Sequence, residues 1–325
     1  MSLYGIGLVA RQEIRTRLRT GRWKLLLGIW FAVVNGLGLL FRIALESSGG
    51  ADAENAGVPM FGGVLLGVLV LTLLVAPALG AQSINGERER GTLAALQITR
   101  LAPGDIVLGK LAAAWGTGLL VLLLTLPCAL VPVLEGEIGV GRAAVTITVT
   151  ALLIGIVCAL SLGWSALVAR SITSVLLSYL TVFGLLAGTP LVFGLALPLT
   201  ETRVTTDHRH AYYTRTRPEL VWWLLVPNPV VILADAAPRQ PAPEPRVTGT
   251  GYGDDHYVPE PFDPLGDIQE EVRETRAGSY DEDEAGPVWP FGLVFGLGLA
   301  GGALGVAAGR LRTPVRAVAR GTRIA

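Results

Sequence analysis

Six long apolar segments constrain the fold of this chain more than any other feature. A helix needs about 20 apolar residues to cross the roughly 30 Å hydrocarbon core of a bilayer, where it satisfies its own backbone hydrogen bonds. The segments of this length are 25–45, 60–81, 111–133, 143–168, 172–199 and 288–308. Hydrophobic residues make up 51% of the chain and charged residues only 16%, against about 25% in soluble domains. The sequence therefore predicts an all-α membrane protein with six transmembrane helices.

Charged residues are distributed unevenly between the two sides of these spans. If the N-terminus is cytoplasmic, the cytoplasmic segments are 1–24, 82–110, 169–171 and 309–325. They hold 16 of the 26 Lys and Arg residues but only four of the 26 Asp and Glu residues. Cytoplasmic loops are enriched in Lys and Arg, so we expect both termini to be cytoplasmic. The excess of Arg over Lys, with much Ala and Gly, is typical of a GC-rich bacterial genome, and we expect the bacterial inner membrane.

The two terminal segments are basic. Within residues 1–24, apolar residues such as Leu3, Ile6 and Val9 are interspersed with arginines, as in a helix that lies on an anionic membrane surface. We therefore predict an N-terminal amphipathic interfacial helix. Residues 309–325 form a short basic tail.

A polar stretch at 200–287 precedes the last span and is predicted to be a large extracytoplasmic loop. Within it, residues 219–235 are apolar but too short to cross the membrane, and they contain Pro227 and Pro229. We predict a re-entrant or interfacial element that bends at the prolines, with Trp222 and Trp223 anchoring it at the outer surface. The alternative is a folded piece of the loop that never contacts lipid.

The last span, 288–308, is rich in glycine. Small residues repeated every four positions let helix backbones approach closely, either within one bundle or between two protomers. The glycines with this spacing are Gly292, Gly296, Gly298, Gly302, Gly305 and Gly309.

The loop at 82–110 carries the most informative motif. It contains a Glu-Arg pair, a Gly-Thr-Leu triplet, a proline and an Ile-Val-Leu-Gly-Lys run. This loop resembles the one that joins the second and third spans of type 2 ABC-transporter permeases, although Ala94 stands where that family usually has an acid. The matching positions are Glu89, Arg90, Gly91, Thr92, Leu93, Leu96, Pro103, Ile106, Leu108, Gly109 and Lys110.

This resemblance implies a coupling role for the loop. Gly91 and Thr92 can begin a short helix whose apolar face holds Leu93 and Leu96. By resemblance, that helix docks into a groove of a separate ATPase subunit and transmits nucleotide-driven closure to the spans. The expected coupling residues are Glu87, Glu89, Arg90, Gly91, Thr92, Leu93 and Leu96. The alternative is a solvated basic loop that only enforces topology.

Several enzymatic and carrier functions are disfavoured. Gly104 to Lys110 fits a phosphate-loop pattern, but Leu111 follows where a Ser or Thr would bind magnesium, so we expect ATP and magnesium on a partner subunit. We expect no metal site, no cofactor in this chain and no nucleic-acid partner. The absence of Asp, Glu and His from the middle of the predicted spans argues against a proton-coupled carrier.

Two functions remain open from the sequence. The favoured one is the permease subunit of an ATP-driven exporter, which pairs with a second permease protomer, with ATPase subunits and with membrane lipid, and which is not itself an enzyme. The alternative is a membrane-anchored structural or sensory protein whose outer loop binds a ligand or partner. The substrate does not follow from the sequence.

Overall fold

The computed structural model describes residues 2–18, 21–48, 56–91, 101–205, 212–240, 263–278 and 286–312. Within this part of the chain, six helical stretches are long and apolar enough to cross a membrane. They are Trp23–Ser47, Gly57–Glu89, Pro103–Ala129, Val140–Leu167, Ser171–Thr200 and Trp289–Leu311. Each overlaps one of the six predicted segments, so the prediction of a multi-pass helical membrane protein is confirmed.

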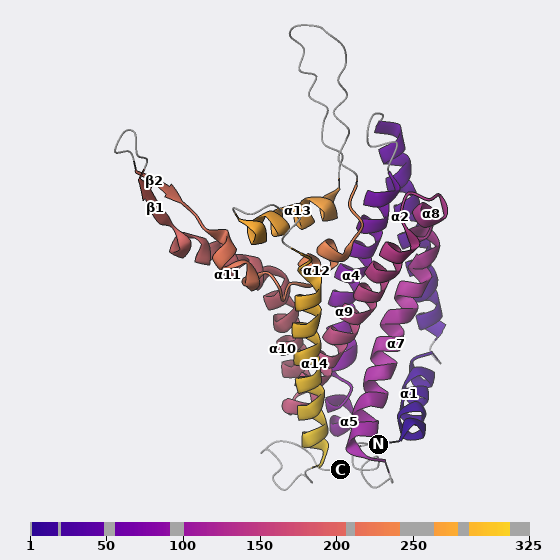
Figure 1. Ribbon diagram of the computed structural model, residues 1–325. Helices are drawn as coiled ribbons and strands as arrows, with labels where there is room; N and C mark the ends of the chain where they lie inside the picture. The colour runs from indigo at the N-terminus through magenta and orange to yellow at the C-terminus, as the bar shows by residue number, and fades with distance from the viewer. Residues whose placement is uncertain are drawn as a thin grey trace.

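The spans form a bundle of roughly parallel helices (Figure 1). Five spans consist mainly of single long helices, which are α2 (Gly21–Ser48), α4 (Gly57–Ala81), α7 (Pro103–Ala129), α9 (Val140–Leu167) and α14 (Trp289–Arg312). The remaining span is composite. It joins α10 (Ser171–Phe183), a π-helical stretch (Gly184–Gly188), α11 (Thr189–Ala196) and a 3-10 turn (Leu197–Thr200).

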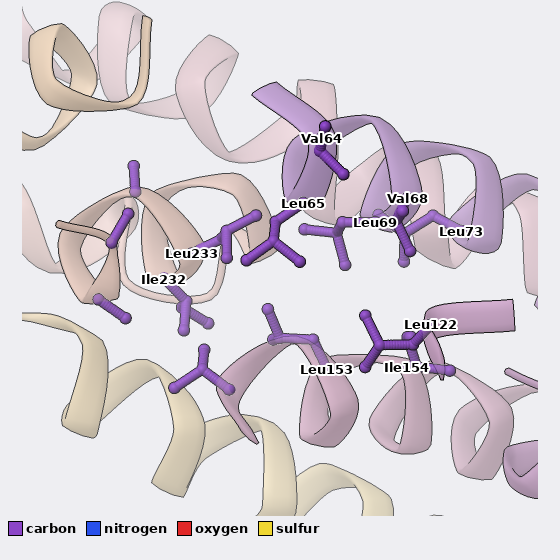
Figure 2. Packing of buried hydrophobic residues seen from close by; sticks show 14 of the residues in the cluster. Val64, Leu65, Val68, Leu69, Leu73, Leu122, Leu153, Ile154, Ile232 and Leu233 are labelled. Atoms are coloured by element: carbon purple, nitrogen blue, oxygen red, sulfur yellow. The ribbon is translucent and has the colours of Figure 1, made fainter. Parts of the chain in front are cut away.

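The core of the bundle lies between α4 and α9. More than half of the apolar window of each helix is buried, whereas only 6% of the window is buried in α2 and in the composite span. Figure 2 shows Leu65 and Leu69 of α4 close to Leu153 and Ile154 of α9, with Ile232 beside them. Helices that are apolar on all sides are expected at such a central position.

Glycines allow the central helices to approach each other closely. A Cβ added to Gly80 of α4 would lie 2.7 Å from the Cβ of Ser161 on α9, and one added to Gly163 of α9 would lie 2.8 Å from the Cβ of Ala303 on α14. Neither position has room for a larger side chain without movement of a helix. These contacts fix the spacing of α4, α9 and α14.

Shorter elements join the spans. They are α1 (Leu3–Leu18), α5 (Asn85–Glu89), α8 (Val131–Leu134), two 3-10 turns (Pro218–Leu220 and Trp222–Leu224), α12 (Pro229–Ala236) and α13 (Pro264–Ala277). Strands β1 (Thr202–Thr205) and β2 (Tyr212–Arg215) pair antiparallel, with Thr202 opposite Arg215. The bundle itself is all-α, as predicted, and this hairpin is confined to the polar loop, where two short runs of β-branched and aromatic residues favour strands.

The two ends of the bundle differ. The end that carries α5 also holds α1, the start of α7 and the end of α14, and we call it the α5 end (Figure 1). A separate apolar cluster lies there, to which Ile84, Ile106, Leu162 and Leu311 contribute. The opposite end, the α13 end, is covered by α12 and α13. Since α1 begins and α14 ends at the α5 end, the two ends of the described chain lie on the same side of the bundle.

Candidate functional site

A buried lysine organises the α5 end. Lys110 lies in the third turn of α7, and 1% of its side chain is exposed. Its Nζ donates to the carbonyl of Ser83 at 2.9 Å and to the Glu87 carboxylate at 2.7 Å, and a Glu13 carboxylate oxygen lies 3.8 Å away. A buried ammonium is tolerated only when it is paired and its donors are satisfied. The side chain therefore joins α1, α5 and α7 and the segment that follows α4.

The α5 helix is held against the bundle by further hydrogen bonds. Ser165 Oγ of α9 accepts the backbone N–H groups of Ile84 and Asn85, each at 3.1 Å, at the point where α5 begins. Glu89 accepts the N–H of Ser171 at 3.0 Å, and Ser171 is the first residue of α10. A carboxylate at a helix N-terminus is stabilised by the unpaired amides and the helix dipole. The α5 helix and its first flanking residue thus contact α7, α9 and α10 through polar groups.

The α1 helix packs on the start of α7 rather than lying apart from the bundle. A Cβ added to Gly109 of α7 would lie 2.6 Å from the Cβ of Val9, so the two helices meet closely at this glycine. Asp105, which is 3% exposed, accepts the N–H of Ser2 at 2.9 Å and that of Ala102 at 3.2 Å. Its carboxylate therefore fixes the start of α1 to the first turn of α7.

The predicted coupling residues fall into two groups. Glu87 points inward to Lys110, Glu89 binds the start of α10, and Arg90 is exposed. Gly91 has a φ of 70° and follows the last residues of α5, so it ends that helix. Gly91 therefore follows a helix end, and the rest of the predicted docking helix, with Thr92, Leu93 and Leu96, lies outside the described residues.

The comparison with protein families agrees with this organisation. Residues 8–218 match the family model described as ABC-2 family transporter protein. The chain belongs to the ABC-2 transporter family. It is a multi-pass permease component of an ABC transporter. No curated protein matches the chain significantly. The matched region of this ABC-2 permease includes the Lys110 cluster and the first five spans, while α12, α13 and α14 follow it.

The structure shows how residues 219–235 of the permease fold, and their predicted re-entrant or interfacial position in the membrane stays a prediction. The segment forms 3-10 turns and then α12, which packs in the apolar core through Ile232 and Leu233. Pro227 lies in the turn that separates the 3-10 turns from α12. Pro229 occupies the first turn of α12, and the Asn228 side chain caps that helix by accepting the N–H of Val230 at 2.9 Å.

The two tryptophans of this segment have different surroundings. Trp222 packs edge to face against Phe291 of α14, and the Arg276 guanidinium of α13 lies 4.9 Å from its ring centre. Trp223 is 58% exposed. Only one of the predicted anchors therefore faces outward, and the other joins α13 to α14.

The predicted packing glycines also separate into two groups. A Cβ added to Gly292 would lie 2.5 Å from the carbonyl oxygen of Val226, and one added to Gly296 would lie 2.9 Å from Ile156. Around the other four, the described residues place nothing within 4 Å of an added Cβ. These four are Gly298, Gly302, Gly305 and Gly309.

Three polar residues with central positions were not identified from the sequence. Glu13 approaches Lys110, Asp235 binds the start of α14, and Asn35 of α2 bonds to the backbone of α7. Asn35 donates to the carbonyl of Leu124 at 2.9 Å and accepts the N–H of Cys128 at 3.0 Å, next to the helix proline Pro127. Asn35 and Asp235 are polar residues within apolar runs, and that isolation is the signal that could have revealed them. Glu13 lies among arginines and carries no such signal.

Proposed function

We propose that this ABC-2 permease is the membrane subunit of an ATP-driven exporter and that a separate ATPase subunit docks at its α5 end. The observation that carries the proposal is the buried cluster around Lys110. Through it, any force applied next to α5 acts on α1 and α7 together, since Glu13, Glu87 and Lys110 belong to three different helices. In a transporter, such a connection converts the closure of a motor subunit into movement of the spans.

The segment 92–100 joins α5 to α7 and contains the docking residues of the proposal. We expect Thr92 to begin a short helix there, with Leu93 and Leu96 on its apolar face, between the charged residues Arg90 and Arg100. Glu89 and Arg90, both exposed at the end of α5, precede this segment along the chain. The partner binds ATP and magnesium, and this chain supplies the docking segment and the translocation path.

The orientation follows from the charge distribution. The α5 end is cytoplasmic, because the segments that begin and end there carry most of the Lys and Arg residues. The α13 end then faces the outside of a bacterial inner membrane. A second permease protomer, identical or related, completes the transporter, and the four unobstructed glycines of α14 offer a face where another helix can approach.

The docking role is tested by replacing the apolar face of the segment with charge. We expect Leu93→Asp/Leu96→Asp to insert in the membrane normally but to lower copurification of the ATPase subunit at least tenfold and to abolish transport. The matched control is Leu134→Asp/Val140→Asp, which alters two exposed apolar residues at the opposite end and should leave ATPase association unchanged. Normal association and transport in the first variant would refute the docking role.

A further inference from the structure

A cavity lies between α2, α4, α7 and α9, separate from the Lys110 cluster. Its volume is about 220 Å³, and its walls are almost entirely apolar. Trp23 and Leu79 line the part toward the α5 end, and Trp30 lies two helical turns further along α2. One water molecule takes up about 15 Å³ of free volume of this kind. A cavity of about 220 Å³ therefore has room for a molecule of roughly 15 heavy atoms.

Two hydrogen-bond donors in this wall are buried without partners. Thr72 of α4 is 6% exposed, and neither its hydroxyl nor the indole N–H of Trp30 has a hydrogen-bond partner among the described residues. Thr117, on the α7 side of the same cavity, behaves differently, because its hydroxyl donates to the carbonyl of Ala113 at 2.9 Å. The hydroxyls of Thr146 and Thr150 in α9 are also bonded to backbone carbonyls.

An unpaired buried donor is costly. Leaving such a group without a partner costs about 1–3 kcal/mol, whereas a bonded pair is mildly stabilising. A purely hydrocarbon occupant would fill the cavity but leave both donors unpaired. An occupant with an accepting oxygen would satisfy them.

We propose that this cavity binds a compact, mainly apolar molecule that carries a carbonyl, ether or hydroxyl oxygen. The apolar body fills the space between α2, α4 and α7, and the oxygen accepts from the Thr72 hydroxyl and the Trp30 indole. Binding requires only this chain. Ligand binding can therefore be measured without the ATPase partner, and a negative result would not affect the proposed function.

The test compares two probes that differ only by the oxygen. The full chain is purified into phosphatidylcholine nanodiscs, and its thermal unfolding is followed with increasing 2-dodecanone or dodecane. A ligand that binds only the folded state raises the unfolding temperature according to its affinity. We expect the ketone to bind wild type roughly fivefold to tenfold more tightly than the alkane, as one or two hydrogen bonds predict. Equal affinities would overturn the proposal.

Variants locate the site. Thr72→Val keeps the shape of the side chain but removes one of the two donors, so we expect normal folding and a weaker preference for the ketone. Thr117→Val is the matched control in the same cavity and should retain that preference. Ala114→Leu fills the cavity and should weaken the binding of both probes. A ketone preference that is unchanged in Thr72→Val, or that falls equally in Thr117→Val, would contradict the assigned site.

Discussion

The ammonium nitrogen of Lys110 lies 2.7 Å from a carboxylate oxygen of Glu87, and this pair holds α5 against α7. The lysine side chain is 1% exposed and that of the glutamate 15%, so water screens the pair only weakly. The pair lies directly before the segment proposed to bind the ATPase. Loss of the pair should therefore lower the stability of the fold and also weaken the connection between the docking segment and the spans.

The first prediction concerns removal of one member of this pair. Glu87→Gln keeps an oxygen that can accept from Lys110 but removes the nearest negative charge from the buried ammonium, and we expect a loss of about 3 kcal/mol in the free energy of unfolding. Lys110→Met/Glu87→Leu removes both charges and should cost less than the sum of the single changes. Denaturant unfolding of the purified protein measures both effects. Lys24→Met, at an exposed position, is the control.

The account of this pair would be wrong if Glu87→Gln unfolded at the same denaturant concentration as wild type. Additive effects in the double variant would also contradict it, because they would show that the two side chains do not interact.

The second prediction concerns Asp235, which holds the α13 end together. Its Oδ2 accepts the N–H groups of Val288 and Trp289 at 2.6 and 2.8 Å, and its Oδ1 accepts from Arg273 at 2.8 Å. Asp235→Ala leaves the first amides of α14 buried without an acceptor, so we expect a loss of about 2–3 kcal/mol. In Asp235→Ala, the backbone amides of α13 should exchange with solvent faster than in wild type, and this increase should be larger than in the other helices.

The matched control for Asp235 is Glu270 of α13, which pairs with Arg239 on the surface of the same cap, the layer that α12 and α13 form over the α13 end. Both side chains are well exposed, so Glu270→Ala should change the free energy of unfolding by less than about 1 kcal/mol. Equal exchange rates in α13 for Asp235→Ala and wild type would show that Asp235 does not hold the cap.

The third prediction concerns pH. Glu137 lies in the turn between α8 and α9. Burial raises the pKa of its carboxyl above the ordinary value, and this effect exceeds the lowering of the pKa by the N–H of Gly57 and by the Arg42 guanidinium. The folded state then binds this proton more tightly than the unfolded state does. Stability should therefore fall as pH rises from about 4.5 through the raised pKa, and stay level above it.

Glu137→Gln removes this titration but keeps an acceptor for Gly57. Comparison of the unfolding temperatures of the two proteins between pH 4.5 and 7 isolates the contribution of Glu137. We expect the unfolding temperature of Glu137→Gln minus that of wild type to increase with pH, because only wild type loses stability as Glu137 ionises. A difference that shrinks as pH rises would reverse the sign and refute the explanation.

The fourth prediction concerns topology. In a cysteine-free background made by Cys128→Ser/Cys158→Ser, single cysteines at Ser279 and Thr322 should be modified from opposite sides of the membrane. An impermeant reagent applied to intact cells should label Ser279→Cys and leave Thr322→Cys unmodified until the membrane is permeabilised. Equal labelling of both positions in intact cells would exclude the proposed orientation.

The sequence identified the spans because their signal is local. A run of about 20 apolar residues is a sufficient condition for a helix in lipid, and no distant contact alters it. The short helix α5 was not identified by such a signal. Its end depends on Gly91, which adopts a positive φ, whereas the sequence pattern indicated a possible helix start at the same glycine.

The cap at the α13 end was not predictable in this way. Pro229 favours either a break or a helix start, and the choice depends on Asn228, which caps α12 and also donates to the carbonyl of Leu186 in the π-helical stretch. Likewise, the sequence shows Lys110 only as a basic residue at the start of an apolar run. Its burial depends on Glu13 and Glu87, which lie far from it along the chain.

The most direct test of the proposed function is a cross-link from the docking segment. A photoreactive residue is placed at Leu93 in the full chain, which is expressed in its native membrane and irradiated with and without ATP and vanadate. We predict a cross-linked partner that contains a phosphate loop, with a yield that changes when nucleotide is trapped. The matched position is Leu134, which should give no such product. If Leu93 cross-links no ATPase while the chain still transports its cargo, this permease is not driven by an ATPase docked at the α5 end.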